Sequence, residues 1–178
     1  MNKNKVRILE IVFLSLAILI AVGFMFKDKF NTNPGSTSNT GSSEMLEANA
    51  VSEEITKDVV VFQKFTNKNK SIKKIALVFN KLYSPNNVNI AIELIDNNNK
   101  TVIKKIVSVD SIKDQHRTYL EADTPITGLA GKELTIRVYP VSNSDTGLAL
   151  MYNDSTGSEF KFGSKNVKGT ICFSVTSE

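Results

Sequence analysis

The fold is decided by residues 88–109, which read VNIAIELIDNNNKTVIKKIVSV. Apolar residues occupy every second position from Val88 to Leu94, which is the period of a strand with one face in a core. The turn-like segment DNNNK at 96–100 suits a hairpin, because Asn and Asp tolerate positive φ and bond their own backbone. The stretch therefore predicts two antiparallel strands, 88–95 and 101–109, joined by a short turn.

Short runs of β-branched and aromatic residues recur on both sides of this hairpin, divided by clusters of Asn, Asp, Gly and Pro. No helical period of any length follows Glu54, so two sheets packed face to face are the favoured solution. We predict an all-β fold for residues 51–178, an antiparallel β-sandwich of about eight to ten strands. The other predicted strands are 59–65, 75–79, 117–121, 134–138, 147–152, 159–162 and 170–176.

The second marked feature is an apolar run at residues 8–26, most of it the uncharged stretch IVFLSLAILIAVGFMF. A helix of this length comes near the thickness of the hydrocarbon layer, about 30 Å. More basic residues precede the run than follow it, which places the N-terminus in the cytoplasm. We therefore expect a cytoplasmic tail at 1–7 and a transmembrane signal anchor at 8–26 in contact with the lipid bilayer. Cleavage after Gly23, as in a secretory signal, is the alternative, and it exports the domain equally.

Glu10 within the apolar run resembles the early Glu of type IV pilin helices. The chain departs from pilins at Lys5, where they carry a Gly before the processing site, and at Asn33-Pro34-Gly35, which ends the helix. We read Glu10 as a residue at the level of the lipid headgroups.

Residues 27–50 read as a flexible linker, because NTNPGSTSNTGSS at 31–43 is too polar to pack and too rich in Gly to stay helical. A coil of about a dozen such residues holds the domain roughly 20 Å from the bilayer. The expected location is the cell membrane, with a single pass and an extracytoplasmic C-terminal domain.

Composition excludes several classes of function. The formal net charge is +4, and half of it falls within the first 45 residues, so the folded part lacks the basic stripe of a nucleic-acid binder. Cys172 is the single cysteine, which excludes an intramolecular disulfide and suits a small apolar filler. We therefore expect no nucleic-acid partner.

Several segments between residues 59 and 153 follow one another in the same order as in a known kind of domain. They are FQKF at 62–65, IKKIALVF at 72–79, NIAIELID at 89–96, IKD at 112–114, LAGKELTI at 129–136 and GLALMY at 147–152. In this order they resemble the jelly-roll, galactose-binding-like domains of bacterial envelope and membrane-bound carbohydrate-active proteins. The resemblance implies a jelly-roll sandwich and a lectin-like scaffold. It transfers no binding residue, and the chain departs from sugar-binding members in having no Trp.

The sequence carries no sign of catalysis. His116 is the only His, and no metal-spaced pattern, catalytic triad or phosphate-cradling Gly loop is present. We expect a protein that is not an enzyme and that holds no cofactor. Asp110 and Asp114 are loop carboxylates that suit a structural calcium, although both also suit the capping of a short turn.

Tyr83 is the one aromatic residue inside a turn-rich polar loop, where Asn86 and Asn87 follow it. Sugar recognition uses aromatic faces for C–H groups and amides for hydroxyls, so these three residues are the candidate ligand contacts. Tyr119, Tyr139 and Tyr152 lie in or directly beside predicted strands and are expected to pack in the core or on a sheet surface. The predicted function is a non-catalytic module that binds envelope carbohydrate. The alternative is an assembly or scaffold protein whose sandwich docks on another membrane protein.

Overall fold

The computed structural model describes residues 45–177 of the 178-residue chain. The predicted tail at 1–7, the predicted anchor at 8–26 and the predicted linker as far as residue 44 lie outside this range. Over the described residues, no helix has the length and hydropathy that a membrane crossing needs.

The described residues form twelve strands, β1 to β12, and one short 3-10 turn, η1. Their bounds are β1 Ala50–Glu54, β2 Val61–Thr66, β3 Ser71–Lys81, β4 Asn89–Asp96, β5 Thr101–Ser108, η1 Val109–Ser111, β6 Arg117–Thr127, β7 Glu133–Pro140, β8 Leu148–Asn153, β9 Glu159–Phe162, β10 Lys165–Lys168, β11 Thr170–Ile171 and β12 Phe173–Thr176.

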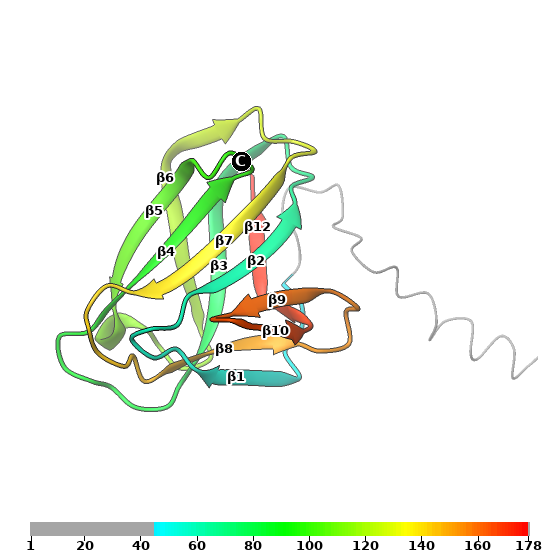
Figure 1. Ribbon diagram of the computed structural model, residues 1–178. Coiled ribbons are helices and arrows are strands. Elements are labelled where there is room, and N and C mark those ends of the chain that lie inside the picture. The colour runs from blue at the N-terminus through cyan, green and yellow to red at the C-terminus, as the bar shows by residue number, and fades with distance from the viewer. Residues whose placement is uncertain (1–44, 178) are drawn as a thin grey trace, which may run out of the picture. The chain divides into compact units, whose positions relative to one another are not determined.

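These strands make two antiparallel sheets packed face to face (Figure 1). The sheet nearer the viewer in Figure 1, which we call the front sheet, has the order β10-β9-β2-β7-β4-β5. The back sheet has the order β1-β8-β3-β12, with β6 paired to β3 and β11 paired to β8. The prediction of an all-β antiparallel sandwich is confirmed.

The hairpin predicted at residues 88–109 forms as expected, since β4 pairs with β5 in antiparallel register. The Oδ1 atom of Asp96 accepts hydrogen bonds from the backbone N–H groups of Asn98 and Lys100, both at 2.9 Å. Asn99 adopts a φ of 60°, a left-handed conformation that Asn tolerates better than most residues. The Asx turn inferred from DNNNK thus sets the register of the hairpin.

The structure has more strands than predicted at three places. Strands β1 and β10 were not foreseen, and the predicted strand 170–176 is divided into β11 and β12 at Cys172. β1 pairs with β8 in an irregular register, and the Ser52 side chain accepts the N–H of Leu150 at 2.9 Å. β1 is short, mostly polar and paired in part through a side chain, so its residues show no apolar alternation from which a strand could be predicted.

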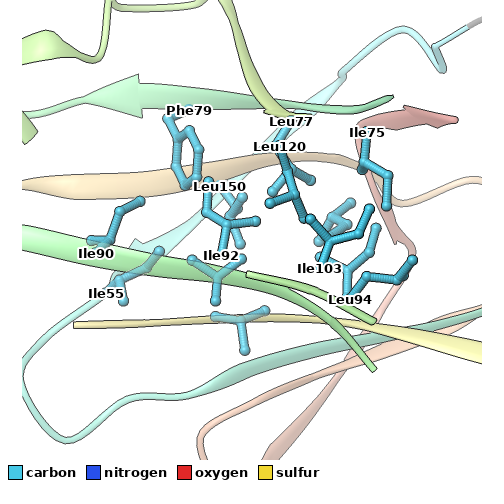
Figure 2. Packing of buried hydrophobic residues seen from close by; sticks show 14 of the residues in the cluster. Ile55, Ile75, Leu77, Phe79, Ile90, Ile92, Leu94, Ile103, Leu120 and Leu150 are labelled. Atoms are coloured by element: carbon cyan, nitrogen blue, oxygen red, sulfur yellow. The ribbon is translucent and has the colours of Figure 1, made fainter. Parts of the chain in front are cut away.

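The core lies between the sheets and is built from alternate residues of each strand. Figure 2 shows Ile92 and Leu94 of β4 on the front-sheet side of this core and Leu120 and Leu150 of the back sheet opposite them. Burying a side chain of this size contributes roughly 1.5–3 kcal/mol. Because Ile92 and Leu94 point inward, the residue between them, Glu93, points to the outer face of the front sheet.

Cys172 is a core filler, as the sequence suggested, with 1% of its surface exposed. Burial raises the pKa of its thiol to about 11. The thiol therefore stays protonated at neutral pH and lacks the thiolate character that reactive cysteines need.

Candidate functional site

The predicted contact Tyr83 lies in the connection between β3 and β4 and is 49% exposed. Its hydroxyl donates a hydrogen bond to Oε1 of Glu54 at 2.6 Å, and the same oxygen accepts the N–H of Gly147 at 2.8 Å. This hydrogen bond to Glu54, with smaller contributions from desolvation and nearby carboxylates, raises the pKa of Tyr83 to about 12. Tyr83 thus fastens its loop to the end of β1, while its ring remains accessible.

Asn86 and Asn87 follow Tyr83 in the same loop and are both exposed. Asn87 has a φ of 58°, so it serves as a turn residue there. The three residues predicted as ligand contacts therefore share one loop, with Tyr83 tied to a neighbouring strand and the two amides at the surface.

The predicted metal residues Asp110 and Asp114 lie in the adjacent connection between β5 and β6. Asp110 accepts a hydrogen bond from the hydroxyl of Ser84 at 2.9 Å, and Asp114 accepts the backbone N–H of Lys81 at 2.7 Å. Within residues 45–177, no group of three or more His, Cys, Asp or Glu side chains could hold a metal ion. Asp110 thus joins the two connections, and Asp114 ties its connection to the end of β3.

A second group stands out on the outer face of the front sheet, around Glu93. This side chain is 2% exposed, although it points away from the core. It lies between Lys104 of β5 and Arg137 of β7, which are its partners in the register of the neighbouring strands. A carboxylate buried this deeply is costly unless it is ion-paired and hydrogen-bonded.

Three side chains satisfy the Glu93 carboxylate. Arg137 donates from Nε to Oε2 of Glu93 at 2.8 Å, and a terminal nitrogen of its guanidinium donates to the same oxygen. The other carboxylate oxygen, Oε1, accepts a hydrogen bond from the hydroxyl of Tyr139 at 2.6 Å and lies 2.9 Å from Nζ of Lys104. We call these four residues the Glu93 cluster.

The Tyr139 ring is held by both cations of the cluster. Nζ of Lys104 lies 5.6 Å from the ring centroid and Cζ of Arg137 lies 5.2 Å from it. Lys104 also donates to the Tyr139 hydroxyl at 3.0 Å. Cation–π contacts of this length add to the hydrogen bonds, so the ring has little freedom to change its orientation.

The electrostatics of the cluster keep Glu93 ionised. Burial by itself would raise the pKa of the Glu93 carboxyl, but hydrogen bonds from its three partners outweigh burial and lower this pKa to about 2. The pKa of Lys104 is raised, first by its hydrogen bond with Tyr139 and then by Glu93. At neutral pH the cluster therefore holds one carboxylate and two cations, and Glu93 cannot serve as a general acid.

The cluster continues into a line of side chains across the whole front sheet. Residues in direct register succeed one another on the same face, and we call this line the outer row. Its members, from β5 to β10, are Lys104, Glu93, Arg137, Phe62, Lys161 and Asn166.

The face that carries the outer row is open to solvent. None of the described strands lies over it in Figure 1. Ile106, beside the row on β5, is 54% exposed, and the side chains of Lys104 and Arg137 are 46% and 34% exposed. The guanidinium of Arg137 has five N–H donors, of which Glu93 takes two, so donors remain for a ligand.

No model of a known protein family matches the chain, and no curated protein matches it at a significant level.

Sequence reasoning did not find the Glu93 cluster. A signal was present in the predicted hairpin, because Glu93 interrupts an apolar strand and stands opposite Lys104 once the turn is placed. The contribution of Arg137 and Tyr139 could not be inferred, because the pairing of β7 with β4 joins segments far apart in the sequence. Tyr139 lies on a sheet surface, which is one of the two placements expected for it, the other being the core.

Proposed function

We propose that the chain is a non-catalytic module that binds cell-envelope carbohydrate on the outer face of its front sheet. The observation that carries the proposal is the Glu93 cluster, in which a buried carboxylate holds an aromatic ring and two cations on an open surface. Side chains fixed before binding lose little conformational freedom when the ligand arrives. The C–H faces of a sugar ring pack on aromatic side chains, while its hydroxyls bond the free donors of Arg137 and Lys104.

The scaffold of this module is, we infer, a jelly roll of the galactose-binding-like kind. Strands β1 to β8 supply the orders β1-β8-β3-β6 and β2-β7-β4-β5, which are the two four-stranded sheets of a jelly roll. The chain crosses between the sheets at nearly every step, with β3, β6 and β8 in the back sheet and β2, β4, β5 and β7 in the front sheet. This alternation of sheets supports the resemblance found in the sequence.

The proposed location is the outer side of the cell membrane, with residues 8–26 as a single-pass anchor and residues 51–178 outside. Protease treatment of intact cells tests this location. We expect the protease to remove the C-terminal domain and to leave a protected N-terminal fragment that contains the anchor. Full protection of the domain in intact cells, with digestion only after lysis, would contradict this location.

The binding experiment compares two tyrosines on opposite faces of the sandwich. The full-length chain, kept in a mild detergent, is tested by pull-down with envelope polysaccharide and on an array of envelope saccharides. Tyr139→Ala should abolish binding, because it removes the ring from the Glu93 cluster. Tyr119→Ala is the matched control, since Tyr119 is 40% exposed on β6 of the back sheet and should leave binding unchanged. Undiminished binding by Tyr139→Ala, or no binding at millimolar sugar, contradicts the proposal.

The second candidate function is an assembly or scaffold protein that docks on another membrane protein. It is favoured by three exposed apolar side chains in neighbouring connections, Leu82 at 51%, Tyr83 at 49% and Val141 at 49%. The backbone N–H of Leu82 donates a hydrogen bond to the carbonyl oxygen of Gly147, in the connection between β7 and β8. These side chains therefore belong to one end of the sandwich. A photo-crosslinker placed at Leu82 in living cells should capture a protein neighbour. Recovery of uncross-linked chain alone would count against docking.

A further inference from the structure

The charge of the outer face identifies the class of ligand, an inference that rests on the proposed carbohydrate function. Alternation along the strands places five cations and three carboxylates on this face of the front sheet. They are Lys64, Lys104, Arg137, Lys161 and Lys168 against Glu93, Glu133 and Glu159. The face therefore has an excess of positive charge.

Two of the three carboxylates are already engaged. Both oxygens of Glu93 are bonded within its cluster, and Glu133 lies 3.0 Å from Nζ of Lys64. Lys161 is exposed and forms no ion pair with any of the described residues. Arg137 retains donors beyond those bonded to Glu93. Free cationic capacity thus remains at Arg137, Lys161 and Lys168, of which Arg137 and Lys161 belong to the outer row.

Arg137 and Lys161 lie on strands that are separated by one other strand of the front sheet. Phe62 lies between Arg137 and Lys161 in the register, on the strand that separates theirs. Neighbouring strands lie about 4.8 Å apart, so the backbones at Arg137 and Lys161 are roughly 10 Å apart, with Phe62 on the strand between them. This separation is comparable with the repeat of an extended disaccharide. A chain that carries one acidic group in each disaccharide matches the pattern of cation, ring and cation.

We propose that the ligand is an acidic glycan that lies across the strands along the outer row. Its anionic groups pair with Arg137 and Lys161, and a sugar ring between them packs on Phe62. A neutral glycan would leave the excess positive charge without a partner. A dense polyanion fits less well, because the exposed Glu159, which forms no ion pair with the described residues, would face it and repel its closely spaced charges.

The experiment titrates the full-length chain in mild detergent with four kinds of polymer by calorimetry. Hyaluronan and polygalacturonate carry carboxylates, poly(glycerol phosphate) carries phosphodiesters, dextran is neutral, and polyphosphate is an anion without sugar. We expect binding to an acidic polymer that contains a polyol or sugar, with a Kd that rises at least about tenfold between 50 mM and 500 mM NaCl. Preference for a carboxylate glycan supports the whole proposal. Preference for poly(glycerol phosphate), which has no sugar ring, supports the pairing of anions with Arg137 and Lys161 but overturns the packing of a sugar ring on Phe62.

Charge variants locate the interaction. Lys161→Gln removes an exposed cation that holds nothing in the fold, and it should weaken hyaluronan or poly(glycerol phosphate) binding about fivefold. Lys113→Gln makes the same change of charge in the connection between β5 and β6 and should leave the Kd unchanged.

The outcomes separate this inference from the function on which it rests. Dextran binding that equals hyaluronan binding and does not respond to salt overturns the acidic ligand and leaves the carbohydrate function standing. Equal binding by the Lys161→Gln and wild-type chains also overturns the acidic ligand. Binding to polyphosphate alone, or to none of the polymers, overturns both proposals.

Discussion

Replacing Glu93 by Gln is the most informative perturbation of the fold. The variant keeps the size of the side chain and its place on β4, but it removes the charge that holds Arg137 and Lys104. Because Glu93 is 2% exposed, water cannot substitute for those partners at the carboxylate itself. We therefore expect a loss of stability that depends on the ionisation of this one group.

The magnitude follows from the pKa of Glu93, which is lowered from 4.5 to about 2 in the fold. At 1.36 kcal/mol for each unit of pKa, ionised Glu93 stabilises the native state by about 3 kcal/mol at pH 7. Arg137 and Lys104 are 34% and 46% exposed, so water solvates them in part when the carboxylate is gone. The expected cost of Glu93→Gln at pH 7 is therefore about 2 kcal/mol.

The pH dependence has a definite sign. A lowered pKa means that the stabilisation is complete above pH 4.5 and is lost as the pH falls from 4.5 toward 2. Urea unfolding of the full-length chain in mild detergent, followed by circular dichroism, should show wild type and Glu93→Gln converging over that interval. Glu133→Gln is the matched control, because its pair with Lys64 is exposed and should contribute below about 0.5 kcal/mol. A difference between wild type and Glu93→Gln that stays constant from pH 7 to pH 2 would refute the reasoning.

Three further predictions concern the scaffold. Gly147→Ala should destabilise the chain by about 2 kcal/mol or more in urea unfolding, because φ is +65° there and a Cβ would lie 2.4 Å from the carbonyl oxygen of Tyr83; an unchanged urea midpoint would contradict this. Ile92→Ala should cost about 2–5 kcal/mol because Ile92 is fully buried, whereas Ile106→Ala, at a position 54% exposed, should stay within about 0.5 kcal/mol of wild type; equal losses would show that the core is misplaced. Cys172 should react with a thiol reagent at pH 8 only after urea is added, since its pKa is about 11 and it is 1% exposed; rapid labelling of the native chain would be incompatible with its burial.

The sequence predicted the parts of the fold that depend on neighbours along the chain. Alternation in residues 88–95 and the Asx turn at Asp96 are local, and both appear in the structure as expected. β1 was missed because its residues are mostly polar and its pairing depends on β8, nearly a hundred residues later. β10 was missed for a similar reason, since a four-residue strand on a sheet edge shows too few alternations to be recognised.

The candidate site was less predictable than the fold, because its members meet only through pairing between distant strands. Tyr83 was predicted as a ligand contact because it is an aromatic residue in a polar loop. In the structure its hydroxyl donates a hydrogen bond to Glu54 and ties the loop to β1. Tyr139 and Arg137 look like ordinary outward positions of a half-buried strand until β7 is placed beside β4. Glu93 then becomes a buried ion pair, a property that no local pattern expresses.

The central claim is that the outer face of the front sheet, and not the loop at one end, receives the ligand. The direct measurement is an NMR titration of the isotope-labelled full-length chain in detergent micelles with short hyaluronan or poly(glycerol phosphate) fragments. We predict chemical-shift changes at Phe62, Lys104 and Arg137 and at the Tyr139 ring, with residues 82–88 unaffected. Shift changes confined to residues 82–88, or no changes at millimolar ligand, would contradict the claim.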